Sequence, residues 1–366
     1  MNKLFDFANA TIVTAMATIA VLAIGAAGMP IRDGHDVYNS SCASCHGIDG
    51  RGRAQAQVGF DTPLPDFTDC IFASREADGD WATIVHEGGP IRSFSRLMPA
   101  FGDALGEDEI EAAIAHIRTF CKDPRWPRGE FNFPRGLFTE KAFPEDEAMW
   151  TTLFNLSGPT GINSELKYEK RFGPRGQLEV GVPLAVARSQ VGLGDIAVAW
   201  KQNVMADVAA GTIVSLGGEF VLPTGDEKKD LGGGTTVFEP FLLFGQVLPN
   251  DMFFQGQVFA EFPFRSGHND ELGWRSAVGR TWASNMGFGT SWTPMLEVLG
   301  ARELVGGAEL EWDLVPQIQV SLSHRQHILL NLGVRLPVTQ TSERDTQFGI
   351  YIIWDWFDGG LTEAWH

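Results

Sequence analysis

Apolar and polar residues follow two different periods in this chain, and the change falls near residue 148. Before it, the clearest pattern is helical, because Ile110, Ala113, Ile114 and Ile117 recur at spacings of three and four and form one apolar stripe. After it, apolar residues alternate with polar or charged ones. The two periods predict a helical N-terminal domain followed by a C-terminal domain made of strands.

The alternation is unbroken in residues 308–314, and it recurs in residues 254–262, 317–323 and 330–336. Segments of about ten residues with one apolar and one polar face are typical of antiparallel strands in a transmembrane β-barrel. A soluble antiparallel sheet with one wet face produces the same alternation, so a soluble β domain is the competing interpretation.

Three features favour the membrane. Tryptophan and phenylalanine gather near strand ends, short turns such as Phe172–Gly176 and Pro249–Asp251 contrast with the long polar stretch Pro223–Thr236, and an aromatic strand, Phe348–Phe357, comes nearly last. The number of strand-like segments is odd, whereas single-chain bacterial barrels have even numbers. We therefore expect twelve strands, with fourteen as the alternative, and one miscounted segment between residues 263 and 346.

Residues 1–28 are predicted to be an export signal, with Lys3 near the start, an apolar run over residues 10–22 and small residues at positions 25–28. An uncleaved anchor is the alternative, since residues 10–28 approach the length that spans a bilayer. Either segment delivers the rest of the chain outside the cytoplasm, where disulfides persist.

We expect Cys70 and Cys121 to form a disulfide, with two free thiols as the alternative.

The net charge of −18 argues against nucleic acid as a partner, because the chain could not neutralise phosphates. No Ser-His-Asp set or phosphate loop stands out in the sequence. Residues 122–147 are rich in proline and carry several aromatic residues, which predicts a linker or strap that lies against protein. The predicted domains are therefore residues 30–121, the linker 122–147 and the barrel 148–366.

Cys42-Ala43-Ser44-Cys45-His46 is the strongest chemical signal in the chain. Two cysteines separated by two residues and followed at once by histidine form the attachment pattern of c-type haem. Each thiol of Cys42 and Cys45 would add to one haem vinyl group, and His46 would be the proximal iron ligand. A zinc site or a redox dithiol is the alternative for the cysteine pair alone.

Residues 30–121 resemble a class I cytochrome c, an all-α domain. The resemblance includes Gly34 and Tyr38 before the haem motif, the turn over residues 49–52 after it, and Trp81 and residues 98–102 further on. It implies one covalent haem c and a distal ligand within the Met98-Pro99-Ala100-Phe101-Gly102 stretch.

Met98 is the distal ligand that this resemblance implies, with His46 and Met98 together holding the iron. A His/Met pair raises the reduction potential and leaves no open position on the iron, which favours electron transfer over oxygen chemistry. His86 is the rival ligand, although a surface histidine is its simpler interpretation.

The stretch Leu222–Asp226 with the glycines at 232–234 resembles outer-membrane proteins linked to phenol degradation. The whole arrangement resembles the fused cytochrome–porins of iron-oxidising bacteria, which pass extracellular electrons inward. Those proteins have larger barrels and smaller haem segments than this chain.

These patterns predict an outer-membrane cytochrome–porin fusion that transfers electrons at or across the membrane, a carrier rather than a catalyst with its own substrate. Its partners would be outer-membrane lipid, a periplasmic electron carrier, and an extracellular metal ion or small organic substrate. The alternatives are a channel for small organics or ions with an attached cytochrome, and a haem-dependent oxidoreductase with a soluble β domain.

A domain of this size looks too wide for a twelve-strand pore, so we expect the cytochrome on the periplasmic side, at the barrel mouth. Inward acidic side chains are expected to give the lumen an affinity for cations. The predicted residues are Glu165, Glu169, Glu261, Glu309, Glu311 and Asp313.

Overall fold

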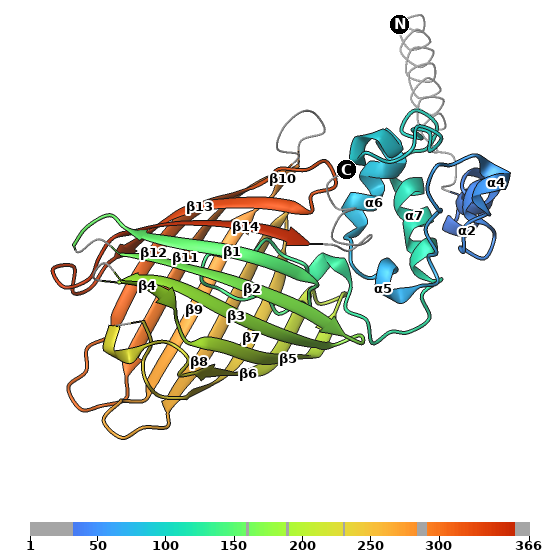
Figure 1. Cartoon of the computed structure of the whole chain (residues 1–366). Coiled ribbons are helices and arrows are strands. Elements are labelled where there is room, and N and C mark those ends of the chain that lie inside the picture. The colour runs from blue at the N-terminus through green and yellow to red at the C-terminus, as the bar shows by residue number, and fades with distance from the viewer. Residues whose placement is uncertain (1–31, 159–160, 188–189, 230, 284–290, 356–366) are drawn as a thin grey trace, which may run out of the picture.

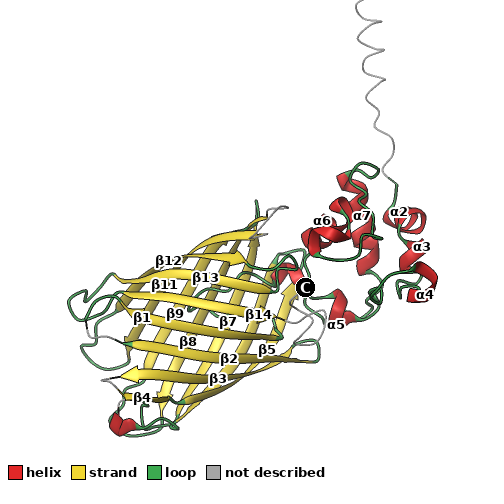
Figure 2. Ribbon diagram, turned by 45° about the horizontal axis from the view of Figure 1, so that its top comes forward, coloured by secondary structure: helices red, strands yellow, loops and turns green. Residues whose placement is uncertain are grey.

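A computed structural model shows a small helical domain at one end of a barrel of tilted strands (Figures 1 and 2). It describes residues 32–158, 161–187, 190–229, 231–283 and 291–355. The predicted export signal, residues 1–28, lies outside the described residues.

The helical domain contains six short α-helices and one 3₁₀ helix within the described chain. They are α2 (Gly34–Ser41), α3 (Ala43–His46), α4 (Gln55–Val58), α5 (Cys70–Ala73), α6 (Asp78–Glu87), η1 (Gly89–Arg92) and α7 (Glu107–Arg118).

Helices α2 and α7 form the centre of this domain, and their contact depends on a glycine. A Cβ atom on Gly34 would lie 1.9 Å from the carbonyl oxygen of Ala112, so a larger residue there would push the helices apart. Val37 and Tyr38 of α2 are fully buried against Ile114 of α7. The glycine and tyrosine that the sequence resemblance singled out thus have structural roles.

The predicted apolar stripe of the last helix is confirmed. Ile110, Ala113, Ile114 and Ile117 are the buried residues of α7. Its N-terminus is capped by Glu109, whose carboxylate accepts a hydrogen bond from the backbone N–H of Gly106 at 3.2 Å. This cap satisfies one backbone donor that the helix cannot pair internally.

The second domain is made of antiparallel strands. They are β1 (Glu147–Asn155), β2 (Ile162–Phe172), β3 (Gly176–Ala187), β4 (Gln190–Leu193), β5 (Ile196–Asp207), β6 (Thr212–Leu222), β7 (Val237–Leu248), β8 (Met252–Pro263), β9 (Glu271–Arg280), β10 (Trp282–Ala283), β11 (Ser291–Glu303), β12 (Glu311–Ser321), β13 (Ile328–Pro337) and β14 (Gln347–Asp355).

Twelve of these strands form a closed ring. β14 pairs with β1, and β9 pairs with β11, so both potential edges are joined. The short strand β4 pairs only with β3, and the short strand β10 pairs only with β11, so neither is counted as a strand of the ring. The favoured number of twelve strands is confirmed, and in the described chain each of these twelve strands has a neighbour on both sides.

The two ends of the barrel differ as the sequence predicted. Strands β2 and β3 are joined by residues 173–175, and β7 and β8 by residues 249–251, whereas residues 223–236 connect β6 to β7 at the other end and include η3 (Glu227–Lys229). One predicted lumen residue is misplaced, because Glu309 precedes β12 and hydrogen-bonds Gln340 in a neighbouring loop.

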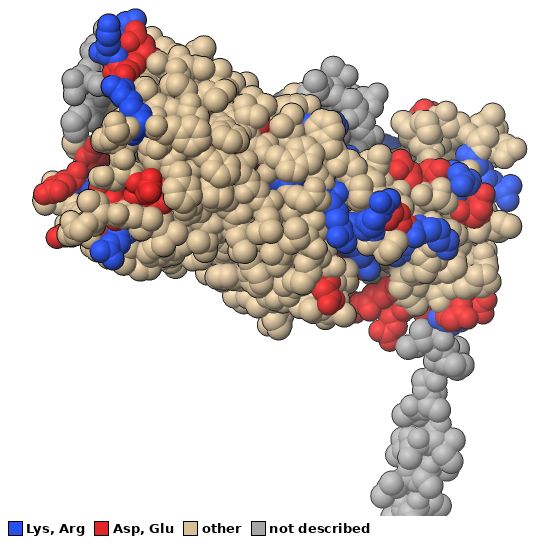
Figure 3. Space-filling model, turned by 90° about the horizontal axis from the view of Figure 1, so that it is seen from below, with Lys and Arg blue, Asp and Glu red and all other residues tan. Residues whose placement is uncertain are grey.

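The outer face of the barrel is apolar. Leu216, Leu242 and Val258 lie side by side on β6, β7 and β8 and are 45%, 42% and 48% exposed. Figure 3 shows the same property at larger scale, with charged side chains gathered toward the ends of the barrel and few between them. Within the described residues, no helix has both the length and the apolar character needed to cross a bilayer.

Candidate haem site and barrel lumen

The haem motif forms a single helical turn. Cys42 is the C-cap of α2 and the N-cap of α3, and its carbonyl accepts hydrogen bonds from the N–H groups of Cys45 at 3.1 Å and His46 at 2.9 Å. The two thiols are not joined to each other. The turn therefore presents two reduced cysteines and the following imidazole together, as attachment of haem c requires.

His46 is buried in a way that suits an iron ligand. Its ring stacks on Phe67 with centroids 5.2 Å apart, and burial lowers the pKa of the imidazole to about 4, so the ring is neutral at pH 7. Its Nδ1 atom is buried without a hydrogen-bond partner in the described chain. A neutral imidazole with an unused buried nitrogen fits the histidine of a haem site.

Met98 lies in the loop between η1 and α7 and packs partly buried against the core that contains Phe67. The carbonyl of Met98 accepts a hydrogen bond from Gly89 N–H at 3.1 Å, which fixes this loop on α6 and η1. His46 and Met98 therefore contact the same apolar cluster, although 51 residues separate them in the sequence.

His86 occupies a different environment. Its side chain is 48% exposed at the end of α6, and its Nδ1 atom lies 2.9 Å from a carboxylate oxygen of Glu87. This is the surface histidine that the simpler interpretation predicted.

The remaining cysteines are joined in the structure. A disulfide links Cys70 at the start of α5 to Cys121 after α7, with Cα atoms 5.1 Å apart. It ties the segment before α6 to the end of the last helix and closes a separation of 51 residues.

The helical domain is held on the short-turn end of the barrel by charged side chains. Arg75 forms an ion pair of 2.5 Å with Asp146, which lies just before β1, and Lys170 of β2 reaches the other oxygen of the same carboxylate at 2.6 Å. Further round the same ring, in the turn between β12 and β13, Arg325 lies over the Phe94 ring at 4.7 Å. The domain thus contacts the mouth at two separate places.

The segment between the domains lies inside the lumen. We call residues 131–146 the lumen strap. Its backbone groups bond inward side chains from strands around the ring, which is possible only from inside the barrel. The partners are Gln177 of β3, Lys201 of β5, Ser215 of β6, Gln255 and Gln257 of β8, Arg275 of β9, Glu297 of β11, Gln317 of β12, Asn331 of β13 and Tyr351 of β14.

Arg135 is the centre of the strap. Its guanidinium is 2% exposed and pairs with Glu140 of the strap, with Glu147 of β1 at 2.8 Å and with Glu169 of β2 at 2.7 Å. Phe133 stacks on Phe253 of β8 with centroids 5.5 Å apart. The strap therefore has both an ionic and an apolar anchor in the barrel wall.

The predicted acidic lumen is partly neutralised by these contacts. Glu169 is buried against Arg135, and Asp313 pairs with Arg335 at 2.7 Å and Arg344 at 2.5 Å. Strap residues line two cavities of about 240 and 280 Å³, the first beside the helical domain and the second beside Glu165 and Lys167 in the lumen.

Residues 29–117 match the family model of cytochrome c oxidase, cbb3-type, subunit III. With the site described above, this match identifies the N-terminal domain as a c-type cytochrome, for which haem c is the cofactor. The chain thus joins a c-type cytochrome domain to a closed barrel of twelve antiparallel strands. No curated protein sequence matches it.

Solved structures with a similar barrel include the NanC porin (10% identity, TM-score 0.44, 57% of this chain and 100% of that one) and an outer membrane channel from Pseudomonas putida F1 (11%, 0.42, 61% and 100%). The KdgM porin is similar as well (11%, 0.40, 57% and 99%). These similarities concern the fold of the barrel alone. The evidence that the barrel lies in a membrane is the apolar outer face of this chain, which includes Leu216, Leu242 and Val258 and which we call the apolar belt.

Proposed function

We propose that this protein transfers electrons at the outer membrane, with the cytochrome domain at the periplasmic mouth of the barrel. Haem c, attached through Cys42 and Cys45 and ligated by His46 and Met98, would supply a one-electron couple. A single haem is proposed, because the chain has one Cys-x-x-Cys-His motif.

The lumen strap is the observation that carries this proposal. A channel for organic molecules needs an open passage, whereas residues 131–146 bond to inward side chains around the ring and bury Arg135 among three carboxylates. With the passage occupied by protein, the cytochrome is better explained by electron exchange than by attachment to an open pore.

The lengths of the turns support the proposed side of the membrane. Outer-membrane barrels have short turns on the periplasmic side and long loops outside. The cytochrome domain contacts the short-turn end, where Arg325 lies between β12 and β13 and where Arg175 between β2 and β3 donates to the carbonyl of Arg125 at 3.0 Å. This end therefore supports a periplasmic cytochrome.

Two aromatic side chains lie between His46 and the junction of the cytochrome domain with the barrel. The Phe67 ring that stacks on His46 also lies 5.5 Å from Trp81 of α6, centroid to centroid. Asp80, the residue before Trp81, lines the cavity between the cytochrome and the barrel. A redox partner at this junction would therefore be separated from His46 by two aromatic side chains.

The test uses purified holoprotein in liposomes with an electron acceptor sealed inside and a lipid-impermeant reductant outside. We expect the haem to be reduced and, if electrons cross, the interior acceptor as well, with both signals lost in His46→Ala. The same liposomes should not swell in small sugars. Swelling that is independent of the haem would instead establish a plain channel and overturn the proposal.

A further inference from the structure

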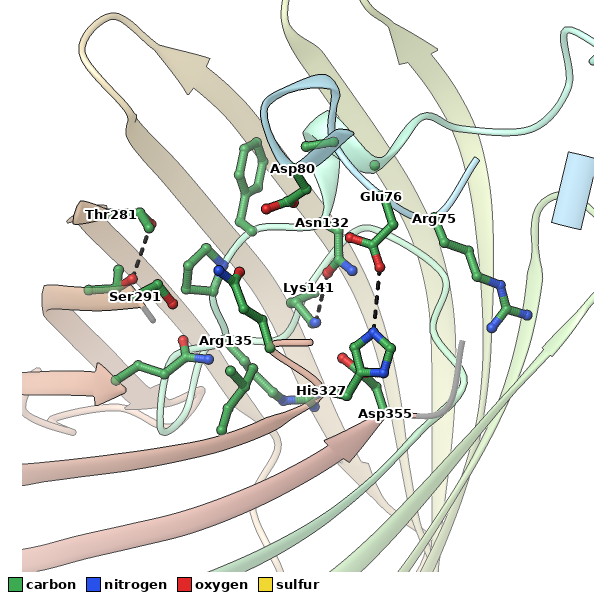
Figure 4. Close-up of a pocket in the computed structure, with 18 of the residues that line it drawn as sticks. Arg75, Glu76, Asp80, Asn132, Arg135, Lys141, Thr281, Ser291, His327 and Asp355 are labelled. Atoms are coloured by element: carbon green, nitrogen blue, oxygen red, sulfur yellow. Dashed lines mark hydrogen bonds and ion pairs between the residues drawn. The ribbon is translucent and has the colours of Figure 1, made fainter. Parts of the chain in front are cut away.

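A polar cavity of about 240 Å³ lies where the cytochrome domain, the lumen strap and the barrel meet (Figure 4). Glu76 and Asp80 line it from the cytochrome domain, Asn132 from the strap, and His327 and Asp355 from the barrel. All three parts of the molecule thus contribute polar side chains to one space.

His327 lies between two carboxylates in this cavity. Its Nε2 atom is 3.6 Å from a carboxylate oxygen of Glu76, and its Nδ1 atom is 3.9 Å from a carboxylate oxygen of Asp355. Figure 4 shows the imidazole between them, with Glu76 coming from the cytochrome side and Asp355 from the end of β14. Both distances exceed those of a normal hydrogen bond.

Most other charged groups around the cavity have their own ionic partners. Arg75 pairs with Asp146, Arg135 with three glutamates and Lys141 with Glu145 at 2.5 Å. Asp80 lies 3.6 Å from Arg92.

Glu76 and Asp355, by contrast, share only His327 as an ionic partner among the described residues. Arg325 also lines the cavity, with its guanidinium over the Phe94 ring. Two carboxylates therefore face a single imidazole, which carries at most one positive charge.

Two buried oxygen atoms at the cavity also lack a hydrogen-bond partner in the described chain. They belong to Asp355, which is 6% exposed, and to Gln319 of β12, which is 4% exposed. Buried acceptors are ordinarily satisfied, and exceptions mark places where a water or an ion is missing from the description.

We propose that this cavity binds a first-row divalent cation, with His327 Nε2 and the Glu76 carboxylate as protein ligands. Ligand atoms at 2.0–2.2 Å from a tetrahedral ion lie about 3.4 Å apart, close to the observed 3.6 Å. Asp355 would accept from Nδ1–H and orient the ring, the usual arrangement behind a metal-bound histidine.

Water would complete the coordination sphere. Two carboxylates and a neutral imidazole carry a charge that a divalent ion balances. Because Glu76 belongs to the cytochrome domain and His327 to the barrel, the ion would also join the two domains.

The test is calorimetric titration of the chelator-treated, haem-loaded full chain in detergent with Zn²⁺. We expect one site, weakened at least tenfold in His327→Ala and in Glu76→Gln, and about 10–100-fold in Asp355→Asn. The haem spectrum and heat-modifiable gel migration show that each variant is folded.

His35→Ala is the matched control. It removes the histidine of the exposed Asp33–His35–Asp36 group, another arrangement with metal-binding spacing. Zn²⁺ affinity should survive this change. Failure of the folded wild-type chain to bind Zn²⁺, unchanged affinity in His327→Ala, or loss of the site in His35→Ala would each overturn the proposal. The outcome is independent of electron transfer, since Zn²⁺ is redox-inert.

Discussion

At the scale of single residues, the haem motif was accessible from the sequence because its chemistry is local. The residues from Cys42 to His46 form one turn, so their order in the chain is their order in space. The neighbourhood of Met98 was not accessible, because it depends on α6 and η1 packing beneath the loop. Only a resemblance to known domains could point to that residue.

Met98→Ala should lower the haem reduction potential by on the order of 0.1 V or more, because a thioether ligand favours the reduced iron. Redox titration of the purified protein measures this change. His86→Ala is the control and should leave the potential unchanged, since this side chain is half exposed beside Glu87. The opposite pattern would make His86 the ligand.

The buried charge of Arg135 had no signal in the sequence. An arginine in a proline-rich stretch is most simply a solvated residue, and its three carboxylate partners come from two strands and from the strap itself. Its role exists only after the barrel has closed around it.

At the scale of elements, the carboxylate of Asp78 stabilises the packing of helix α6. Asp78, in its first turn, pairs with Arg118 of α7 at 2.7 Å and with Arg128 ahead of the lumen strap. Burial acts to raise the pKa of Asp78, but the two guanidinium groups outweigh it and lower the pKa below its usual value of 3.8.

A lowered carboxyl pKa stabilises the folded state above the unfolded-state pKa, and this contribution is lost as pH falls through the folded-state value. Asp78→Asn should therefore destabilise the cytochrome domain at pH 7 by about 1 kcal/mol, a small figure because the side chain is partly exposed. It should also weaken the loss of stability in acid below about pH 4. Denaturant titrations at pH 7 and pH 3 measure both effects, and parallel curves for the two proteins would contradict this assignment.

The lumen strap makes a second prediction at this scale. Arg135→Met leaves Glu169 without its ionic partner, while Glu140 and Glu147 keep only Lys167 and Lys141 among the described residues. Breaking a buried ion pair in this way costs about 3–5 kcal/mol. We expect the strap to loosen and ion conductance through planar bilayers to rise.

Arg125→Met is the matched control, because this exposed arginine pairs only with the nearby carboxylate of Asp123 in the described chain. Its conductance should equal that of the wild type. Equal conductance in folded Arg135→Met would show that other contacts hold the strap in place.

At the scale of the whole molecule, the strands were predictable because the alternation of apolar and polar residues and the turn residues mark them along the chain. The count of segments was odd, however, and the number twelve followed from the rule that single-chain bacterial barrels have even numbers of strands. The contents of the barrel interior were not predictable from the sequence. The sequence indicated that residues 122–147 lie against protein, whereas the structure places residues 131–146 of this stretch inside the ring. The prediction that Glu309 faces the lumen was wrong for a related reason. The alternation of apolar and polar residues continues into the loop, so it does not mark where β12 begins.

The apolar belt gives a prediction for the assembled barrel. Leu242→Arg, at the middle of β7, should destabilise the folded barrel in lipid by about 2–4 kcal/mol. Val338→Arg is the control, since this residue lies just beyond the end of β13 and should cost about 0–1 kcal/mol. Reversible urea unfolding in lipid vesicles measures both values, and equal costs would argue against a membrane centred on Leu242.

The position of the lumen strap has a consequence for biogenesis. The strap precedes β1 in the chain, so it leaves the export machinery before any strand of the ring. A ring that closed first would have to admit Arg135 and its aromatic neighbours afterwards through the mouth that the cytochrome covers. The barrel is therefore expected to assemble around a strap already in place.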